Sequence, residues 1–160
     1  MGNAINGEGV SSATGDRAGN DIGLSADGSV LVMGAPLNDG GGVNSGSVRV
    51  FKWDSANSLW QHVIDIDGQP GDELGHSVGV SADGKTIVAG SFMYNNFQGY
   101  FSIYNVNLAT GVAEQVFTDT GDASDSFSYD LQISADGTSV VVSGVQSQKG
   151  FGQRSGYIRQ

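Results

Sequence analysis

The chain has 160 residues, with 7 Lys and Arg against 17 Asp and Glu and a formal net charge of −10. Because affinity for nucleic acid and for anionic membrane surfaces depends on clustered basic residues, this balance disfavours both as partners. The sequence contains no Cys, which excludes disulfides, thiol nucleophiles and Cys-rich zinc sites.

The tetrapeptide Ser-Ala-Asp-Gly occurs three times, at 25–28, 81–84 and 134–137, and the residues around it also recur. The spacing, roughly 50 residues, is in the range of β-propellers and other repeat arrays. Each tetrapeptide follows a stretch with polar or small residues alternating with apolar ones, which indicates a strand with two unlike faces. The Asp-Gly pair predicts a two-residue hairpin of type I′, which needs positive φ angles.

Each unit continues with further predicted strands. The second is a β-branched, apolar run, which is typical of a strand covered on both faces. A third strand follows a Gly-rich loop, and a fourth follows in the first two units. The four sets are 21–24, 77–80 and 130–133; 30–33, 86–89 and 139–142; 46–51, 99–104 and 156–160; 59–65 and 112–118.

The third unit has no fourth strand before Gln160, and only the N-terminus can replace it. The first seven residues precede the first Gly-Asp pair as strand four precedes the later pairs. We therefore predict an all-β fold, a β-propeller with four-stranded antiparallel blades. Blade 1 spans about 18–68, blade 2 about 74–121, and blade 3 about 127–160, completed by an N-terminal strand, 1–9.

Three blades cannot close a ring, since propellers have typically four to eight. We expect two chains to form a six-bladed ring, with each N-terminal strand donated to the other copy. The alternative is a fragment, natural or engineered, of a longer propeller. The first residues have no basic start and no apolar core, so we expect neither a signal peptide nor a membrane span, and the compartment stays open.

The loops offer a candidate binding face. In a four-stranded meander, the connection from strand four to the next strand one lies at the same end as the connection from strand two to strand three. Long loops gathered on a rigid scaffold are common binding sites, and turn residues serving the backbone are the alternative. The candidate ligand-binding residues are Asp39, Asn44, Asp65, Asp67, Asp72, Glu73, Asn95 and Asn96.

The innermost strands predict a second polar group. Asp21, Ser77 and Asp130 stand at matching places where these strands begin, so they are candidates for the rim of a central channel mouth. In a ring of two chains, four carboxylates would surround the axis and could attract a cation. A solvated polar lining is the alternative.

No catalytic residues are predicted, because His62 and His76 are the only histidines and neither has an assignable partner. No cofactor and no metal ligands are predicted either. Trp53 and Trp60 flank the connection from strand three to strand four, where packing of the hairpin competes with stacking against a sugar.

Several motifs of the first unit carry a resemblance. They are Gly34-Ala-Pro-Leu-Asn-Asp-Gly40, Ser45-Gly-Ser-Val-Arg-Val-Phe51, Trp60, Asp65-Ile-Asp-Gly68 and Gly71-Asp-Glu-Leu-Gly75. On these motifs the chain resembles the FG-GAP repeat group of integrin-type β-propellers, which implies an extracellular interaction platform rather than an enzyme. The calcium sites of that group need a long acidic loop between strands one and two, and the tight Ser-Ala-Asp-Gly turn cannot provide the six to eight oxygen ligands of Ca²⁺.

Two function classes follow. The first is a non-enzymatic structural or interaction module that assembles with itself. The second is a ligand-binding propeller, lectin-like or cation-dependent, that uses the acidic loop face to bind an extracellular protein or a glycan. A hydrolase is the third possibility, because propellers host unrelated chemistries.

Overall fold

The computed structural model describes residues 2–7, 15–145 and 157–159 of the chain. Its strands form three antiparallel sheets, which confirms the all-β class and the four-stranded antiparallel design. Sheet 1 contains β1 (Ile22–Leu24), β2 (Val30–Ala35), β3 (Ser47–Asp54) and β4 (Leu59–Asp67). Sheet 2 contains β5 (Ser77–Val80), β6 (Thr86–Ser91), β7 (Tyr100–Asn107) and β8 (Val112–Thr120), and sheet 3 contains β9 (Phe127–Ile133), β10 (Val140–Gly144) and β11 (Tyr157–Arg159).

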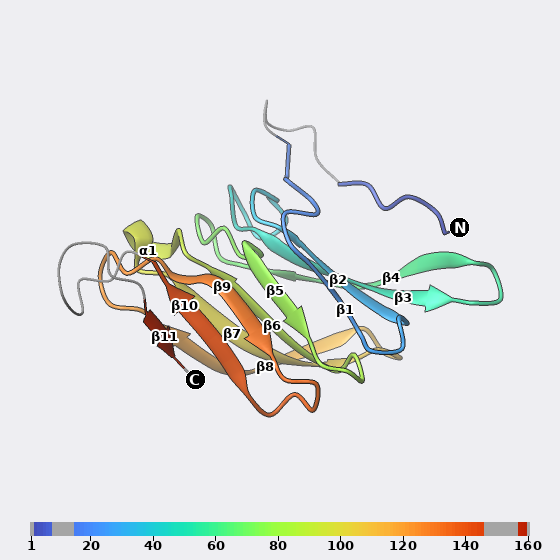
Figure 1. Ribbon diagram of the computed structural model, residues 1–160. Coiled ribbons are helices and arrows are strands. Elements are labelled where there is room, and N and C mark those ends of the chain that lie inside the picture. Colours follow the sequence, from blue (N-terminus) through green and yellow to red (C-terminus); the bar gives the residue numbers. More distant parts are fainter. Residues whose placement is uncertain (1, 8–14, 146–156, 160) are drawn as a thin grey trace.

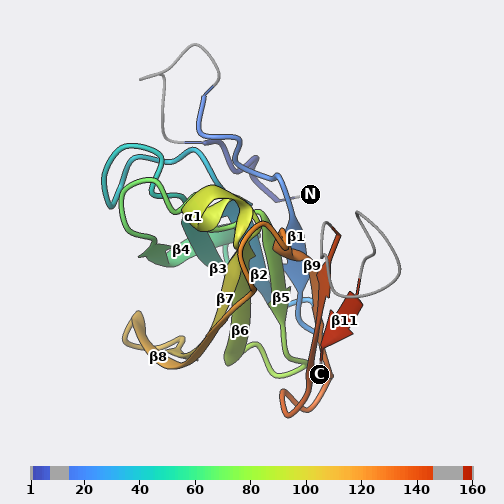
Figure 2. The same cartoon turned by 90° about the vertical axis from the view of Figure 1, so that its left-hand side faces the viewer.

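Sheet 2 lies between sheets 1 and 3, as Figures 1 and 2 show. One apolar core lies between sheets 1 and 2, and another lies between sheets 2 and 3. The continuous apolar runs of the sequence supply these cores, since such runs are typical of strands covered on both faces. Val32 and Val50 of sheet 1 pack with Ile87 of sheet 2 in one core. Val88 and Phe101 of sheet 2 pack with the core of sheet 3 in the other.

The inner strands β1, β5 and β9 contact one another in that order. Close approach depends on a glycine in each of the first two strands. A Cβ on Gly23 would stand 3.3 Å from Val80, and one on Gly79 would stand 3.2 Å from Ile133. The matching residue of β9 is Gln132, which is exposed.

The hairpin after each inner strand differs from the predicted type I′ turn, and that prediction is wrong. Gly28 has a φ of 71° but Asp27 is not left-handed, and the Gly28 N–H donates to Ser25 O at 2.9 Å. The reason is a side-chain network: Ser25 Oγ donates to Asp27 Oδ1 at 2.8 Å and accepts from Val30 N at 2.9 Å. The Ser29 backbone N–H, and then the Ser25 hydroxyl, donate to the ionised carboxyl group and so lower the pKa of Asp27 below its usual value. The two later turns repeat the network.

These turns are also bonded to one another across the sheets. Ala26 N donates to Ala82 O at 3.1 Å, and Ala82 N donates to Ala135 O at 2.8 Å. The bonds run in one direction along the row of turns. In the part of the chain that the structure describes, Ala135 N–H and Ala26 C=O have no such partner.

The helical content of the described residues is one turn, α1 (Tyr94–Phe97), between β6 and β7. Asn95 and Asn96 in it have φ angles of 46° and 58°, so this turn is left-handed. Asn tolerates that region better than most residues. None of the described segments is a helix long and apolar enough to cross a membrane.

The N-terminal residues 2–7 form no strand and lie against sheet 1, far from β11. Asn3 Oδ1 accepts a hydrogen bond from Trp60 N at 2.7 Å, and Asn6 O accepts one from Arg49 Nη1 at 3.1 Å. The predicted strand exchange involves a second chain, so it stays a prediction. Positions 1, 8 and 9 of the predicted strand lie outside the described residues.

Candidate functional site

The loops that were expected to share one end do so around sheet 1. Backbone bonds join the connection after β4 to the loop after β2: Gly71 N donates to Val43 O at 2.9 Å, and Glu73 N donates to Asn44 O at 3.0 Å. Gly46 is required here, because its φ is 70° and a Cβ on it would collide with the Leu74 backbone. The loop face is therefore a fixed surface rather than two independent loops.

Three of the candidate residues contact near neighbours in the sequence, on this face or in α1. Asp39 Oδ1 accepts from Asn44 N at 2.8 Å. Glu73 Oε2 lies 3.1 Å from His76 Nε2. Asn95 Nδ2 donates to Gln98 Oε1 at 2.6 Å, within the turn itself. These contacts are those of turn residues.

Asp65 lies elsewhere, on the face of sheet 1 that no other sheet covers. Its Oδ1 accepts from Arg49 Nε at 3.1 Å and lies 2.7 Å from His62 Nε2. Arg49 is 6% exposed and its guanidinium also lies 5.4 Å from the centre of the Phe51 ring. The guanidinium, carboxylate and imidazole groups bond to one another and lie over this face of β3 and β4.

Two candidate residues, Asp67 and Asp72, come together in a cleft between sheets 1 and 2. The cleft holds about 260 Å³. One wall is the connection after β4, and the other is the outer half of sheet 2, with α1 at one end. The lining residues are Asp67, Gly68, Gln69, Asp72, Tyr94, Tyr100, Ser102, Tyr104, Gln115, Thr118 and Thr120.

Tyrosine rings and hydrogen-bonding groups both line this cleft. Tyr94 and Tyr100 meet edge to face, with ring centres 4.7 Å apart. Tyr100 Oη donates to Asp72 Oδ2 at 3.3 Å, and Gln69 N donates to the same oxygen at 3.0 Å. Burial, and then the Asp72 charge, raise the pKa of Tyr100 far above its ordinary value, so the phenol remains a donor. Burial also raises the pKa of Tyr104.

The residues predicted for a channel mouth make hydrogen bonds to the neighbouring sheet or within their own strand. Asp21 Oδ2 accepts from Val78 N at 2.7 Å, which bonds sheet 1 to sheet 2. Ser77 is 2% exposed and its Oγ donates to Ser128 O at 3.1 Å, which bonds sheet 2 to sheet 3. Asp130 is exposed and its Oδ1 accepts from Leu131 N at 2.9 Å.

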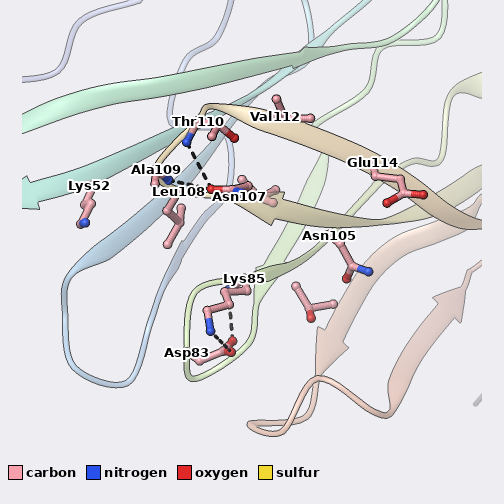
Figure 3. Close-up of a pocket in the computed structure, with 12 residues that line it drawn as sticks. Lys52, Asp83, Lys85, Asn105, Asn107, Leu108, Ala109, Thr110, Val112 and Glu114 are labelled. Carbon is pink, nitrogen blue, oxygen red and sulfur yellow. Dashed lines mark hydrogen bonds and ion pairs between the residues drawn. The ribbon is translucent and has the colours of Figure 1, made fainter.

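A wider groove of about 970 Å³ lies at the opposite end, beside the β7–β8 hairpin (Figure 3). Some of its charged and amide groups are already engaged. Lys85 Nζ lies 3.6 Å from Asp83 Oδ2, and Asn107 Oδ1 accepts from Ala109 N at 3.0 Å within its own turn. In the matching hairpin of sheet 1, Trp53 and Trp60 are cross-strand partners with ring centres 5.2 Å apart.

No group of three or more His, Asp or Glu side chains that could hold a metal ion occurs among the described residues. Sequence reasoning placed Asp67, Asp72 and Tyr94 on one loop face but missed Tyr100, Tyr104 and Gln115. The signal was present in the repeat alignment: Ser102 and Thr118 of sheet 2 stand where sheet 1 has Arg49 and Asp65. Small side chains at both positions leave space.

Comparison with known proteins gives the following result. No family model and no curated protein matches the chain. Similar solved structures include a hydrazine synthase of Kuenenia stuttgartiensis, with 17% identity over 77% of this chain and 30% of that one, at a TM-score of 0.46. TolB from Acinetobacter baumannii has 14% identity over 80% of this chain and 27% of that one, at a TM-score of 0.43. The chain therefore spans less than a third of the length of either structure.

Proposed function

We propose that this chain is a non-enzymatic half-ring of a β-propeller, which pairs with a second copy and acts as a structural or interaction module. In this arrangement, three blades of each chain form a six-bladed ring, and the first residues of one copy complete sheet 3 of the other. The assignment to the FG-GAP repeat group belongs to the same proposal, on the residues that resemble that group.

The open face of β1 is the observation on which the proposal depends. Ile22 is 63% exposed and Leu24 is 57% exposed. The matching residue to Ile22 in sheet 2 is Val78, which is 4% exposed because sheet 1 packs on it. Exposed apolar residues gathered on one sheet face favour a partner surface. The chemically matched partner is another sheet of the same kind.

The outer strands give a second line of support. Phe117 of β8 occupies the position that Ile64 occupies in β4. Ile64 pairs with Val50 of β3, and Phe117 pairs with the matching residue of β7, Ile103. Ile64 is half-buried in the core between sheets 1 and 2, whereas Phe117 is 49% exposed. Sheet 2, which packs on Ile64, has two strands beyond β6, namely β7 and β8. Among the described residues, sheet 3 has one strand beyond β10, namely β11. A fourth strand in sheet 3 would cover Phe117.

Light scattering after gel filtration tests the proposal. We expect a mass twice that of one chain, and a single-chain mass for the double variant I22D/L24D, because charges would have to be buried in the junction. The matched control is V43D, at a residue 74% exposed on the loop between β2 and β3, which should remain a dimer. A wild-type monomer, or a dimer that persists in I22D/L24D, would overturn pairing through this face.

The exchange of strands needs its own variant. Ile5 is a large apolar residue of the first seven, and in the proposed ring it is the side chain that enters the core of the partner's sheet 3. I5D should therefore weaken the dimer, and a chain that begins at residue 10 should not form it. A full-strength dimer of the shortened chain would contradict strand exchange even if I22D/L24D behaves as expected.

A further inference from the structure

We propose that the cleft between sheets 1 and 2 is a saccharide site, built from Tyr94, Tyr100, Asp67, Gln69, Gln115 and Thr118. The cleft lies within one chain, so this inference stands apart from the pairing of two copies. Its groups come from three segments: the connection after β4, the α1–β7 segment and β8.

The first argument is the origin of the cleft. In sheet 1, the face that corresponds to it is filled by the Arg49–Asp65–His62 group. The register places Ser102, Thr118 and Gln115 of sheet 2 at the same three positions. Ser102 Oγ donates to Thr118 Oγ1 at 3.1 Å, so these short side chains stay close to the sheet. The space that a guanidinium and an imidazole occupy in sheet 1 is open in sheet 2.

The second argument is the supply of hydrogen-bonding groups without partners. Asp67 and Gln115 are exposed at the cleft, and neither side chain makes a hydrogen bond or an ion pair with any residue that the structure describes. The Gln69 side chain is in the same state. Carboxylates accept hydrogen bonds and amides both donate and accept, which suits the hydroxyl groups of a sugar.

The third argument is the aromatic wall. Sugars present C–H faces as well as hydroxyls, and tyrosine offers an apolar ring with a polar end. The Tyr100 phenol is fixed by Asp72, and Tyr94 is held edge-on against the Tyr100 ring. The volume, about 260 Å³, is below the roughly 300 to 1,000 Å³ of pockets for drug-sized ligands and suits one sugar ring.

A cation is the competing ligand, since no Lys, Arg or His lines the cleft. The observations favour a sugar because Asp72 already accepts two hydrogen bonds, from Tyr100 and from Gln69 N. Asp67 is then the one carboxylate in the lining that has no partner among the described residues. A single solvated carboxylate is a poor basis for a cation site, and it remains a good acceptor for paired hydroxyls.

The experiment uses the full chain on a glycan microarray, followed by calorimetric titration of the monosaccharide that corresponds to the strongest signal. D67A/Q115A should bind that sugar at least about tenfold more weakly, since hydrogen bonds to a charged group are among the stronger ones in proteins. S102R/T118D, which restores the sheet 1 pair and fills the cleft, should abolish binding. The control is E114Q. Glu114 lies on β8 outside the cleft, so this variant should bind the sugar as the wild type does.

Three results would overturn the site. The first is a folded wild type that binds no glycan on the array, and the second is a sugar that S102R/T118D binds as well as the wild type does. The third tests the competing cationic ligand: it is a wild type that binds the cationic peptide hexa-arginine and no sugar. D67A/Q115A alters exposed side chains that have no described partners, so it should fold even where the filled variant does not. Light scattering of each variant shows whether two copies still pair, so a loss of sugar binding can be told apart from a loss of the dimer.

Discussion

Strands β1 and β5 carry the same element of the repeat in two different surroundings. Ile22 and Val78 occupy matching positions, yet the first is 63% exposed and the second is 4% exposed. Neighbouring positions follow the same rule: Asn20 is exposed, whereas the His76 side chain is 9% exposed and its ring lies 4.5 Å from that of Phe92. The burial of a residue in this molecule therefore depends on whether another sheet precedes its own.

The comparison predicts its largest effect at the inner strands. Leu131 of β9 matches Ile22 of β1, and it is 2% exposed in the core between sheets 2 and 3. L131A should lower the free energy of unfolding by about 2–5 kcal/mol, because it leaves a cavity. I22A should lower it by less than about 0.5 kcal/mol in the isolated chain. Urea unfolding at low protein concentration measures both, and equal losses would break the comparison.

A smaller effect is expected where the sheets approach through glycine. Any side chain at Gly79 would press on Ile133, whereas Gln132 at the matching place in β9 faces no sheet of this chain. G79Q should cost about 1–3 kcal/mol through overpacking.

The reverse change is the control for this position. Q132G should cost about 0.5–1 kcal/mol, the ordinary price of glycine in a strand. The same urea titration reports both variants. A neutral G79Q would show that the two junctions are looser than the contacts of Gly23 and Gly79 indicate.

The smallest effect is a pH dependence at His76. Burial lowers the pKa of His76 below 6.5, and this outweighs the opposing interaction with Glu73. The unfolded chain then binds a proton at a higher pH than the folded chain, so stability should fall as the pH drops below about 6.5 and should level off below the folded pKa. H76N, which places the residue of sheet 1 in sheet 2, should remove this slope. Thermal unfolding between pH 7 and pH 5 in about half-unit steps measures it.

The sequence predicts the strands well because the repeat supplies the alignment. The three Ser-Ala-Asp-Gly copies place β1, β5 and β9 and their partner strands without any further information. The turn itself was mispredicted, because the bonds from Ser25 to Asp27 and Val30 stabilise a longer turn than Asp-Gly alone suggests.

The candidate site was predicted in part. The sequence shows acidic residues in the loops, but their local roles depend on backbone geometry. Asp39, for example, accepts a hydrogen bond from the backbone N–H of Asn44. The cleft depends on which face of β7 turns toward sheet 1, and on the absence there of a side chain like Arg49. Both features depend on how two repeats pack after folding, so they cannot be inferred from the residue types alone.

The row of turns has a consequence for how copies of this chain add together. Each bond from one turn to the next points the same way, with Ala135 N–H at one end and Ala26 C=O at the other. Contacts that continue this row are head-to-tail, and head-to-tail contacts close only when the rotation per unit divides a full circle. In the proposed assembly, the angle between neighbouring sheets would thus decide between a finite particle and an open fibre, and a residue that alters that angle would convert one into the other.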